Sequence, residues 1–420
     1  MLEQYFIKPS TIDRLRGSWI AAEIEAYVVW LVDEGFTAKS IWRRVPIVFA
    51  FGEFSRTRGA ETIAELPAFR DAFVADRVAD HHRRTRSTRP MAKEVRGPLE
   101  QMLSVVLPDF EPTGRRPHPQ PFAEVAPGFF DYLVEERGLR PASIYHYRHH
   151  LDRFESYLGR IGVRSIGELS PTILSAYVVE RADAGLAKST VRDSAGVLRV
   201  FLRYAHREGV LDADLSGAVG WPQVYRLSSV PRSISWNDVN RVLASVERRT
   251  EAGRRDYAIL LLLVTYGLRG REVAALRLDD IDWKNDRLRI PERKAGHSTA
   301  FPLSPVVGEA ILDYLRRGRP ETSDRHVFFR TVAPRHPIGA AAVSSLCRAY
   351  LLKAGVEVPR PGSHTLRHSA VQRLVDADFP LKTIGDFVGH RSARSTEVYA
   401  KVAVERLREV ALGDGEAVLA

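Results

Sequence analysis

Arginine, histidine and tyrosine residues suited to phosphate chemistry gather in the C-terminal half of the 420-residue chain. Arg269 follows an apolar run, His364 and Arg367 lie three positions apart, and Tyr399 follows His390 by nine positions. Guanidinium groups bind phosphate oxygens in a fixed bidentate geometry, and imidazoles transfer protons near neutral pH. Each residue alone is common, but the types, order and spacing together suit the transfer of a phosphodiester.

The sequence around the first three of these residues places them at the ends of helices. Arg269 comes where the apolar run 258–268 closes, so its side chain can leave the core. Ser363, after a Pro-Gly pair, is expected to cap a helix that carries His364 and Arg367 on one face. Taken singly, a solvated surface arginine and a chance His-x-x-Arg pair are the plain alternatives.

A short helix is expected just before the tyrosine. Pro380 near its start and Gly389 at its end bracket apolar positions at helical spacing. This arrangement puts His390 directly after the end of the helix and leaves Tyr399 nine residues farther on.

Between Arg269 and His364 the apolar pattern changes from helical spacing to short alternating runs. Residues 281–283, 287–290 and 299–303 are typical of three strands separated by polar turns. Helical spacing then returns. We therefore expect a block that is mainly α with one small antiparallel β-sheet.

Arg269, His364, Arg367, His390 and Tyr399, in this order and spacing, resemble the signature of the tyrosine recombinase or phage-integrase family. The resemblance implies that the two arginines clamp the scissile phosphate. It implies that the two histidines hydrogen-bond to this phosphate or help to remove the tyrosine proton. The tyrosine would be the nucleophile, which forms a 3′-phosphotyrosyl link and frees a 5′-hydroxyl.

The same resemblance assigns protonation of the departing 5′-oxygen to a lysine on a β-hairpin. Lys294 lies in the turn between the second and third expected strands, and its neighbour Arg293 is the alternative for this general-acid position. Side chains then supply the charge and the proton transfer, so no metal, ATP or other cofactor is expected. The pair Gly270-Arg271 departs from the family, in which an apolar and a small residue are more usual.

Length and charge indicate several domains and a polyanionic partner. A single hydrophobic core stops growing well below 420 residues, so two or three domains are expected. The 62 lysines and arginines against 52 acidic residues give a net charge of +10, which suits double-stranded DNA. The single cysteine, Cys347, excludes an intrachain disulfide and is expected to be a buried apolar residue. Without a secretion signal or a membrane-length apolar run, a cytoplasmic, nucleoid-associated protein is expected.

Stretches rich in proline, glycine and arginine separate three blocks. Ser235 opens a capping-box pattern, so a helix and a new domain are expected to begin there. The resemblance makes the second block the core-binding domain of the family and the third block an integrase-type catalytic domain. The expected boundaries are an N-terminal helical domain at 1–105, a linker at 106–120, a core-binding helical domain at 121–215, a linker at 216–233 and the catalytic domain at 234–420.

The first two blocks also resemble each other. Leu-Val-Asp-Glu at 31–34 matches Leu-Val-Glu-Glu at 133–136, and Thr-Ile-Ala-Glu-Leu at 62–66 matches Ser-Ile-Gly-Glu-Leu at 165–169. The matches favour common ancestry over chance likeness, and each block is expected to form a small helical bundle that grips DNA. The same alignment pairs Phe51 with Phe154 and Phe73 with Tyr177. The residues of the first block expected to contact phosphates are Arg43, Arg44, Arg56, Arg58 and the run 83–89.

The resemblance implies a site-specific recombinase or integrase that serves integration, excision or transposition of a mobile element, within a synaptic tetramer of like or related subunits. A type IB topoisomerase uses a similar site, but two helical blocks before the catalytic domain favour recombination. A catalytically inactive DNA-binding subunit is a further alternative, although all six expected catalytic positions are filled. A metal-dependent nuclease is the last, because His146, His149 and His150 cluster, although no carboxylates stand at matching spacing.

Overall fold

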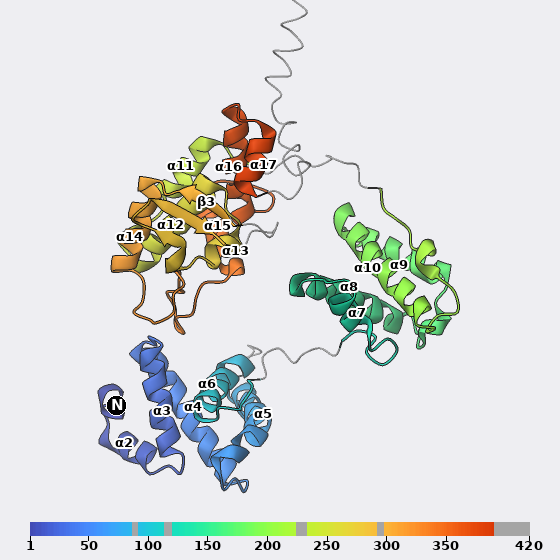
Figure 1. The fold of residues 1–420 in the computed structure, drawn as a ribbon. Coiled ribbons are helices and arrows are strands. Elements are labelled where there is room, and N and C mark those ends of the chain that lie inside the picture. Colours follow the sequence, from blue (N-terminus) through green and yellow to red (C-terminus); the bar gives the residue numbers. More distant parts are fainter. Residues whose placement is uncertain (86–90, 113–119, 224–232, 292–297, 390–420) are drawn as a thin grey trace, which may run out of the picture. The chain divides into compact units, whose positions relative to one another are not determined.

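The structure, a computed structural model, describes residues 1–85, 91–112, 120–223, 233–291 and 298–389 (Figure 1). Helices dominate these residues, and one three-stranded antiparallel sheet accompanies them, which confirms the expected fold class. None of the described helices is long and apolar enough to cross a membrane. The chain divides into two compact units, one formed by Met1–Pro112 with Ser229–Ala420 and the other by Thr113–Ser228.

A buried helix, α12 (Glu251–Tyr266), is the centre of the third block, residues 233–389. Thr250 caps its first turn by accepting a hydrogen bond from the Gly253 N–H at 3.0 Å. Gly267 ends the helix in the left-handed region, with φ 60°. The described helices that pack most extensively on α12 (Figure 1) are α11 (Trp236–Ala244), α13 (Gly270–Ala274), α14 (Pro305–Arg317), α15 (Ala340–Lys353) and α16 (Ser363–Asp376).

The expected strands are present as β1 (Ile281–Asp282), β2 (Arg287–Ile290) and β3 (Thr299–Pro302), in the order β1-β2-β3. Leu288 faces Phe301 across the sheet, and both are buried. The Tyr266 hydroxyl donates to the Pro302 carbonyl at 3.0 Å, so the end of α12 is bonded to the last strand. A short 3-10 turn, η4 (Leu278–Asp280), leads into the sheet.

Two smaller predictions for this block are also confirmed. The Ser235 hydroxyl accepts from the Asp238 N–H at 3.1 Å and caps α11. Cys347 is fully buried in α15 among apolar side chains, as expected of a small apolar residue.

The second block is a helical bundle around a cluster of buried apolar residues between 122 and 219. Aromatic rings of Phe122, Phe129, Phe154 and Phe201 contact one another in its centre. Its elements are α7 (Phe129–Glu135), α8 (Pro141–Arg160), η2 (Ile166–Glu168), α9 (Pro171–Asp183), α10 (Lys188–Arg207) and η3 (Leu215–Ala218).

The first block is a second helical bundle, with buried apolar residues between positions 2 and 103. Trp19 donates its indole N–H to the Gly52 carbonyl at 3.0 Å, and the Ile20 side chain packs against the backbone of Gly52. Its elements are α1 (Leu2–Tyr5), α2 (Pro9–Arg16), α3 (Ala21–Asp33), α4 (Ala38–Arg56), η1 (Ile63–Glu65), α5 (Leu66–Thr85) and α6 (Ala92–Val106).

The two bundles share local construction at the positions that the sequence alignment pairs. Each has a 3-10 turn closed by a capping box, with Thr62 and Glu65 in η1 and Ser165 and Glu168 in η2. In both, a long helix precedes this turn and two helices follow it. The paired aromatic residues also meet in the same way: the ring centroids of Phe51 and Phe73 lie 5.4 Å apart, and those of Phe154 and Tyr177 lie 5.0 Å apart.

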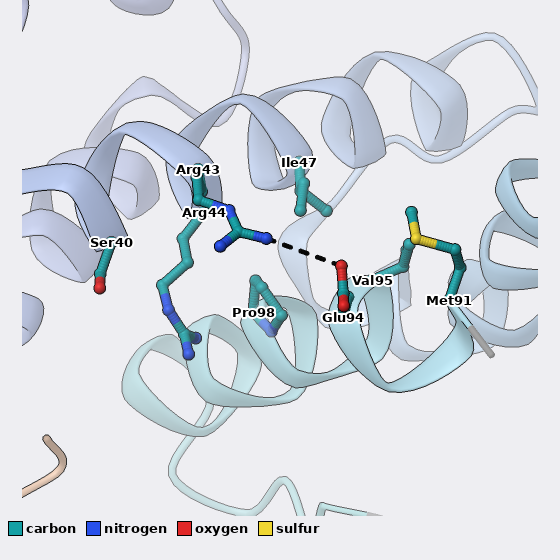
Figure 2. Close-up of a pocket in the computed structure, with 8 residues that line it drawn as sticks. All are labelled: Ser40, Arg43, Arg44, Ile47, Met91, Glu94, Val95 and Pro98. Carbon is teal, nitrogen blue, oxygen red and sulfur yellow. Dashed lines mark ion pairs between the residues drawn. The ribbon is translucent and has the colours of Figure 1, made fainter. Parts of the chain in front are cut away.

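Arginines of the first block that were expected to contact phosphates are engaged with their own bundle. In the groove between α4 and α6, Arg43 forms an ion pair with Glu94 at 3.7 Å (Figure 2). Beside it in the same groove, Arg44 places its guanidinium 4.6 Å from the centre of the Phe36 ring. Arg56 and Arg58 lie over the rings of Trp19 and Phe54 in the same manner. These contacts orient the guanidinium groups, and residues 86–90 of the basic run lie outside the described residues.

The matched capping boxes make a prediction about both bundles. Thr62→Ala and Ser165→Ala each remove the side-chain oxygen that accepts the N–H of the third residue of the turn. Each substitution should lower the local protection of that N–H against hydrogen exchange by about 0.5–2 kcal/mol. Exchange measured residue by residue in the full chain checks this. Thr57→Ala, which alters a hydroxyl that donates to the Phe54 carbonyl, is the control. A loss of protection in only one bundle would contradict the shared construction.

Candidate active site

Three segments that are distant in sequence meet at the candidate site. They are the junction of α12 with α13, the first turn of α16, and the end of α17 (Leu381–Val388). A Cβ atom at Gly267 would lie 3.1 Å from the Val388 side chain, so a glycine there allows α17 to approach the end of α12. Gly389 ends α17 with φ 64°, as the sequence predicts. The close approach therefore depends on a glycine at the end of each helix.

Arg367 joins the ends of α12 and α17. Its guanidinium, which is buried, donates to the Gly267 carbonyl through Nη1 and to the Val388 carbonyl through Nη2, the latter at 2.8 Å. The last carbonyls of a helix lack partners within the helix and carry partial negative charge. A buried cation at this place therefore satisfies both helix ends at once.

Arg269 binds the next carbonyl of the same turn and a buried carboxylate. Its Nη2 donates to the Gly389 carbonyl at 2.9 Å, and its Nη1 donates to Glu272 Oε1 at 2.7 Å. Glu272 Oε2 also accepts the backbone N–H of Arg269 at 2.9 Å. The Glu272 side chain is 1% exposed and that of Arg269 is 15% exposed, so the pair is shielded from water. The carboxylate thus fixes both the backbone and the guanidinium of Arg269.

His364 is the second residue of α16 and lies near both arginines. Burial lowers the pKa of its imidazole below the ordinary value, and the positive charges of Arg367 and Arg269 lower this pKa further. The imidazole is therefore neutral at physiological pH and has a nitrogen that can accept a proton. Sequence reasoning was wrong about the cap of this helix: Ser363 is its first residue, and Gly362 occupies the N-cap without a side-chain bond.

A hollow of about 440 Å³ opens between α13, α15 and the first turn of α16. Arg269, Arg271 and His364 line it, together with the small side chains of Ala340, Ala341 and Ser344. None of the described residues that line it is acidic. Among the described residues, the charges that line this hollow are therefore the positive ones of Arg269 and Arg271. Such a cavity is suited to bind a phosphate.

The structure thus brings together Arg269, His364 and Arg367, three of the six residues singled out in the sequence. Lys294 with Arg293, His390 and Tyr399 lie outside the described residues. Sequence reasoning missed Glu272, although an arginine and a glutamate three positions apart at the start of a helix are a recognisable signal.

The three histidines of α8 lie on one side of the second bundle. The rings of His146 and His150 meet edge to face with centroids 4.4 Å apart, and the centroid of the His149 ring lies 5.4 Å from that of His150. Burial and the neighbouring histidines and arginines lower the pKa of His150 to about 4. Among the described residues, no group of three or more histidine, cysteine, aspartate or glutamate side chains is placed to hold a metal ion.

Comparisons with known proteins agree on one family. The model of the "Phage integrase family" matches residues 232–406, and that of the "Phage integrase, N-terminal SAM-like domain" matches residues 127–209. A candidate integrase/recombinase of Sinorhizobium fredii, y4rA, is 32% identical over 97% of this chain and 98% of its own. Tyrosine recombinase XerC of Pelotomaculum thermopropionicum is 28% identical over 67% of this chain and 94% of its own.

The fold is also that of a solved integrase. A crystal structure of a lambda integrase dimer bound to a COC′ core site is 17% identical, covers 66% of this chain and 76% of its own, and has a TM-score of 0.53. The similarity to the Sinorhizobium fredii relative over the whole chain, together with the two family matches, confirms the resemblance that the sequence motifs indicated. The chain belongs to the phage integrase family, the tyrosine recombinases, which are enzymes that cleave and rejoin DNA.

Proposed function

We propose that the chain is a site-specific recombinase that cuts and rejoins DNA through a 3′-phosphotyrosyl link at Tyr399. The observation that carries this proposal is the convergence of Arg269, His364 and Arg367 around the end of α17. Arg269 and Arg367 bind the carbonyls of Gly389 and Val388, the two residues before His390 in the sequence. Tyr399 follows His390 by nine residues. The segment that carries the expected nucleophile thus starts from a turn held by the phosphate-binding residues.

The two arginines are suited to stabilise the scissile phosphate. Negative charge develops on the non-bridging oxygens during phosphoryl transfer, and donors that are already fixed there lower the barrier. The bonds of Arg269 to Glu272 and Gly389 use two of the five N–H donors of its guanidinium, so other donors can meet phosphate oxygens. In this proposal Arg269 and Arg367 bind the scissile phosphate from two sides.

His364 is the group to which we assign removal of the tyrosine proton. Its imidazole is kept neutral by burial and by the adjacent arginines, so it can accept a proton at physiological pH. His390 follows the end of α17 and is assigned to a hydrogen bond with the same phosphate. The cations that bind the phosphate therefore also hold their neighbour in the proton-accepting form.

The proposed chemical step conserves the energy of the phosphodiester. The Tyr399 oxygen attacks phosphorus and loses its proton to His364, while the bond from phosphorus to the 5′-oxygen breaks. Lys294, with Arg293 as the alternative, donates the proton that the departing 5′-oxygen takes up. A 5′-hydroxyl of another strand then reverses the step, so the proposal needs neither ATP nor a metal ion.

The remaining expectations belong to the same proposal. Residues 234–420 form the catalytic domain and 121–215, which overlap the SAM-like match, form the core-binding domain, with linkers at 106–120 and 216–233. Residues 1–105 form a second helical module. Strand exchange needs several active sites, so the partners are double-stranded DNA sites and a tetramer of recombinase subunits on them. Integration, excision or transposition of a mobile element is the proposed role.

The nucleophile can be tested by trapping it. A target duplex with a nick beside the cleavage site loses the short fragment that carries the 5′-hydroxyl, so the reversal is blocked and the protein stays linked to DNA. Mass spectrometry should find the DNA remnant on Tyr399, and Tyr399→Phe should abolish the link but retain DNA binding. Tyr257→Phe, which alters another tyrosine of this block, should still form the covalent link. A remnant on a different residue, or a link formed by Tyr399→Phe, would refute the assignment.

The proton acceptor makes a prediction about pH. Because the pKa of His364 is lowered, the NMR titration midpoint of its ring should lie below the ordinary value of about 6.5. Arg269→Gln removes a positive charge and should raise this midpoint, whereas Arg316→Gln on α14 should not. The rate of link formation should fall as pH decreases through the midpoint, because a protonated imidazole cannot accept a proton. A rate that is flat across this range would argue against His364.

A further inference from the structure

Arg271 lies beside the candidate active site, at a position where the chain departs from the usual family pattern. It lines the same hollow as Arg269 and His364, on the short helix α13. Its side chain is exposed, and it forms no ion pair with any residue that the structure describes. The guanidinium of Arg271 is therefore available at the mouth of the site, and it takes no part in the contacts that hold Arg269.

At two glycines beside the hollow, the backbone lies close to a serine side chain. A Cβ at Gly270 would lie 3.0 Å from Ser363 Oγ, and a Cβ at Gly362 would lie 2.7 Å from Ser344 Oγ. A side chain at either glycine would require the opposing serine side chain to give way, so the glycines let α13 and α15 lie close to the first turn of α16. The pair Gly270-Arg271 thus has a physical reason: the glycine lets the elements meet, and the arginine next to it lines the space between them.

Charge and room favour an anion in this space. The wall that faces Arg271 consists of Ala340, Ala341 and Ser344, which are small and uncharged. Among the described residues, no carboxylate lines the hollow beside Arg271, and Glu272 is bonded to Arg269 at 2.7 Å. A guanidinium without an acidic partner among the described residues, in an open hollow of about 440 Å³, is suited to a phosphate group.

Arg271 and Arg269 are not placed to bind the same phosphate. Residues two positions apart on a helical turn do not face each other. Arg269 is also fixed to the end of α17 by its bond to the Gly389 carbonyl, whereas Arg271 is exposed. Successive phosphates of one DNA strand follow at about 3.4 Å along the helix axis. A neighbouring phosphate of the same strand is therefore within the span of the site when the scissile one lies at Arg269.

We propose that Arg271 binds a non-scissile phosphate of the cleaved strand, next to the scissile one, and acts as a positioning residue for the reaction. This inference rests on the proposed function, because it takes the phosphate at Arg269 to be the scissile one. Arg271 touches no reacting atom in this account. It holds the strand in register, so that the scissile phosphate meets Arg269 and Arg367.

Methylphosphonates, each of which replaces one phosphate of the DNA by a neutral group, can test this inference phosphate by phosphate. A set of target duplexes carries one methylphosphonate at each phosphate around the cleavage position, and affinity is measured for each with the wild-type protein and with Arg271→Ala. With the wild type, neutralising one flanking phosphate should weaken binding on the order of tenfold. With Arg271→Ala, binding should already be weaker and neutralising that same phosphate should have no further effect. The slope of log affinity against log salt should fall by about 0.9.

Two variants serve as controls. Arg271→Lys retains the charge and should restore most of the salt slope, although a lysine cannot reproduce bidentate binding. Arg316 is an exposed arginine on α14 that does not line the hollow. The variant Arg316→Ala should therefore respond to every methylphosphonate as the wild type does.

Several outcomes would overturn the inference. One is that Arg271→Ala stays as sensitive as the wild type at every flanking phosphate. Another is that Arg271→Ala becomes insensitive only to the substitution of a base, which would indicate that Arg271 contacts a base edge. If the wild type forms no link at Tyr399 but still shows the methylphosphonate coupling, the proposed function fails and the phosphate contact stands, so the two failures can be told apart.

Discussion

The buried ion pair between Glu272 and Arg269 is the interaction on which the geometry of the site depends. A carboxylate that is 1% exposed accepts both the backbone N–H and the guanidinium of the arginine, so neither has freedom to rotate. Removing one partner of such a pair leaves an uncompensated buried charge, which is strongly destabilising. The pair therefore fixes the Arg269 cation at the proposed site of reaction, so that DNA would not have to order it.

Hydrogen bonds from Arg269 and its neighbour Arg367 also fix the end of α17. Arg269 and Arg367 donate to the carbonyls of Gly389 and Val388, and Arg367 also binds that of Gly267. Carbonyls at helix ends suit this role because they are partly negative and lack partners within the helix. The turn before His390 is thereby held by the residues proposed to bind phosphate. Under the proposed function, these two side chains link the binding of DNA to the positioning of the nucleophile.

Much of this could be predicted from the sequence, where local signals are strong. The strands at 281–302, the cap at Ser235 and the glycine that ends α17 follow from alternation and from preferences at helix ends. The cap assigned to Ser363 was wrong because Gly362 takes the N-cap position, where its backbone lies close to Ser344 of α15, a contact that only the tertiary structure shows. The bonds from the arginines to α17 join residues about 20 and 120 positions apart, so no local pattern could indicate them.

The most direct test of the account is the rate of covalent link formation by Glu272→Gln at saturating DNA. Glutamine keeps the shape but not the charge that orients Arg269. Misplacement of a catalytic group by about 1 Å costs on the order of 10²-fold in rate, so a loss of this size is predicted for the folded, DNA-bound variant. The matched control is Asp280→Asn, which alters another buried carboxylate that accepts a backbone N–H, from Arg277 at 3.0 Å. An unchanged rate in Glu272→Gln would contradict the central claim.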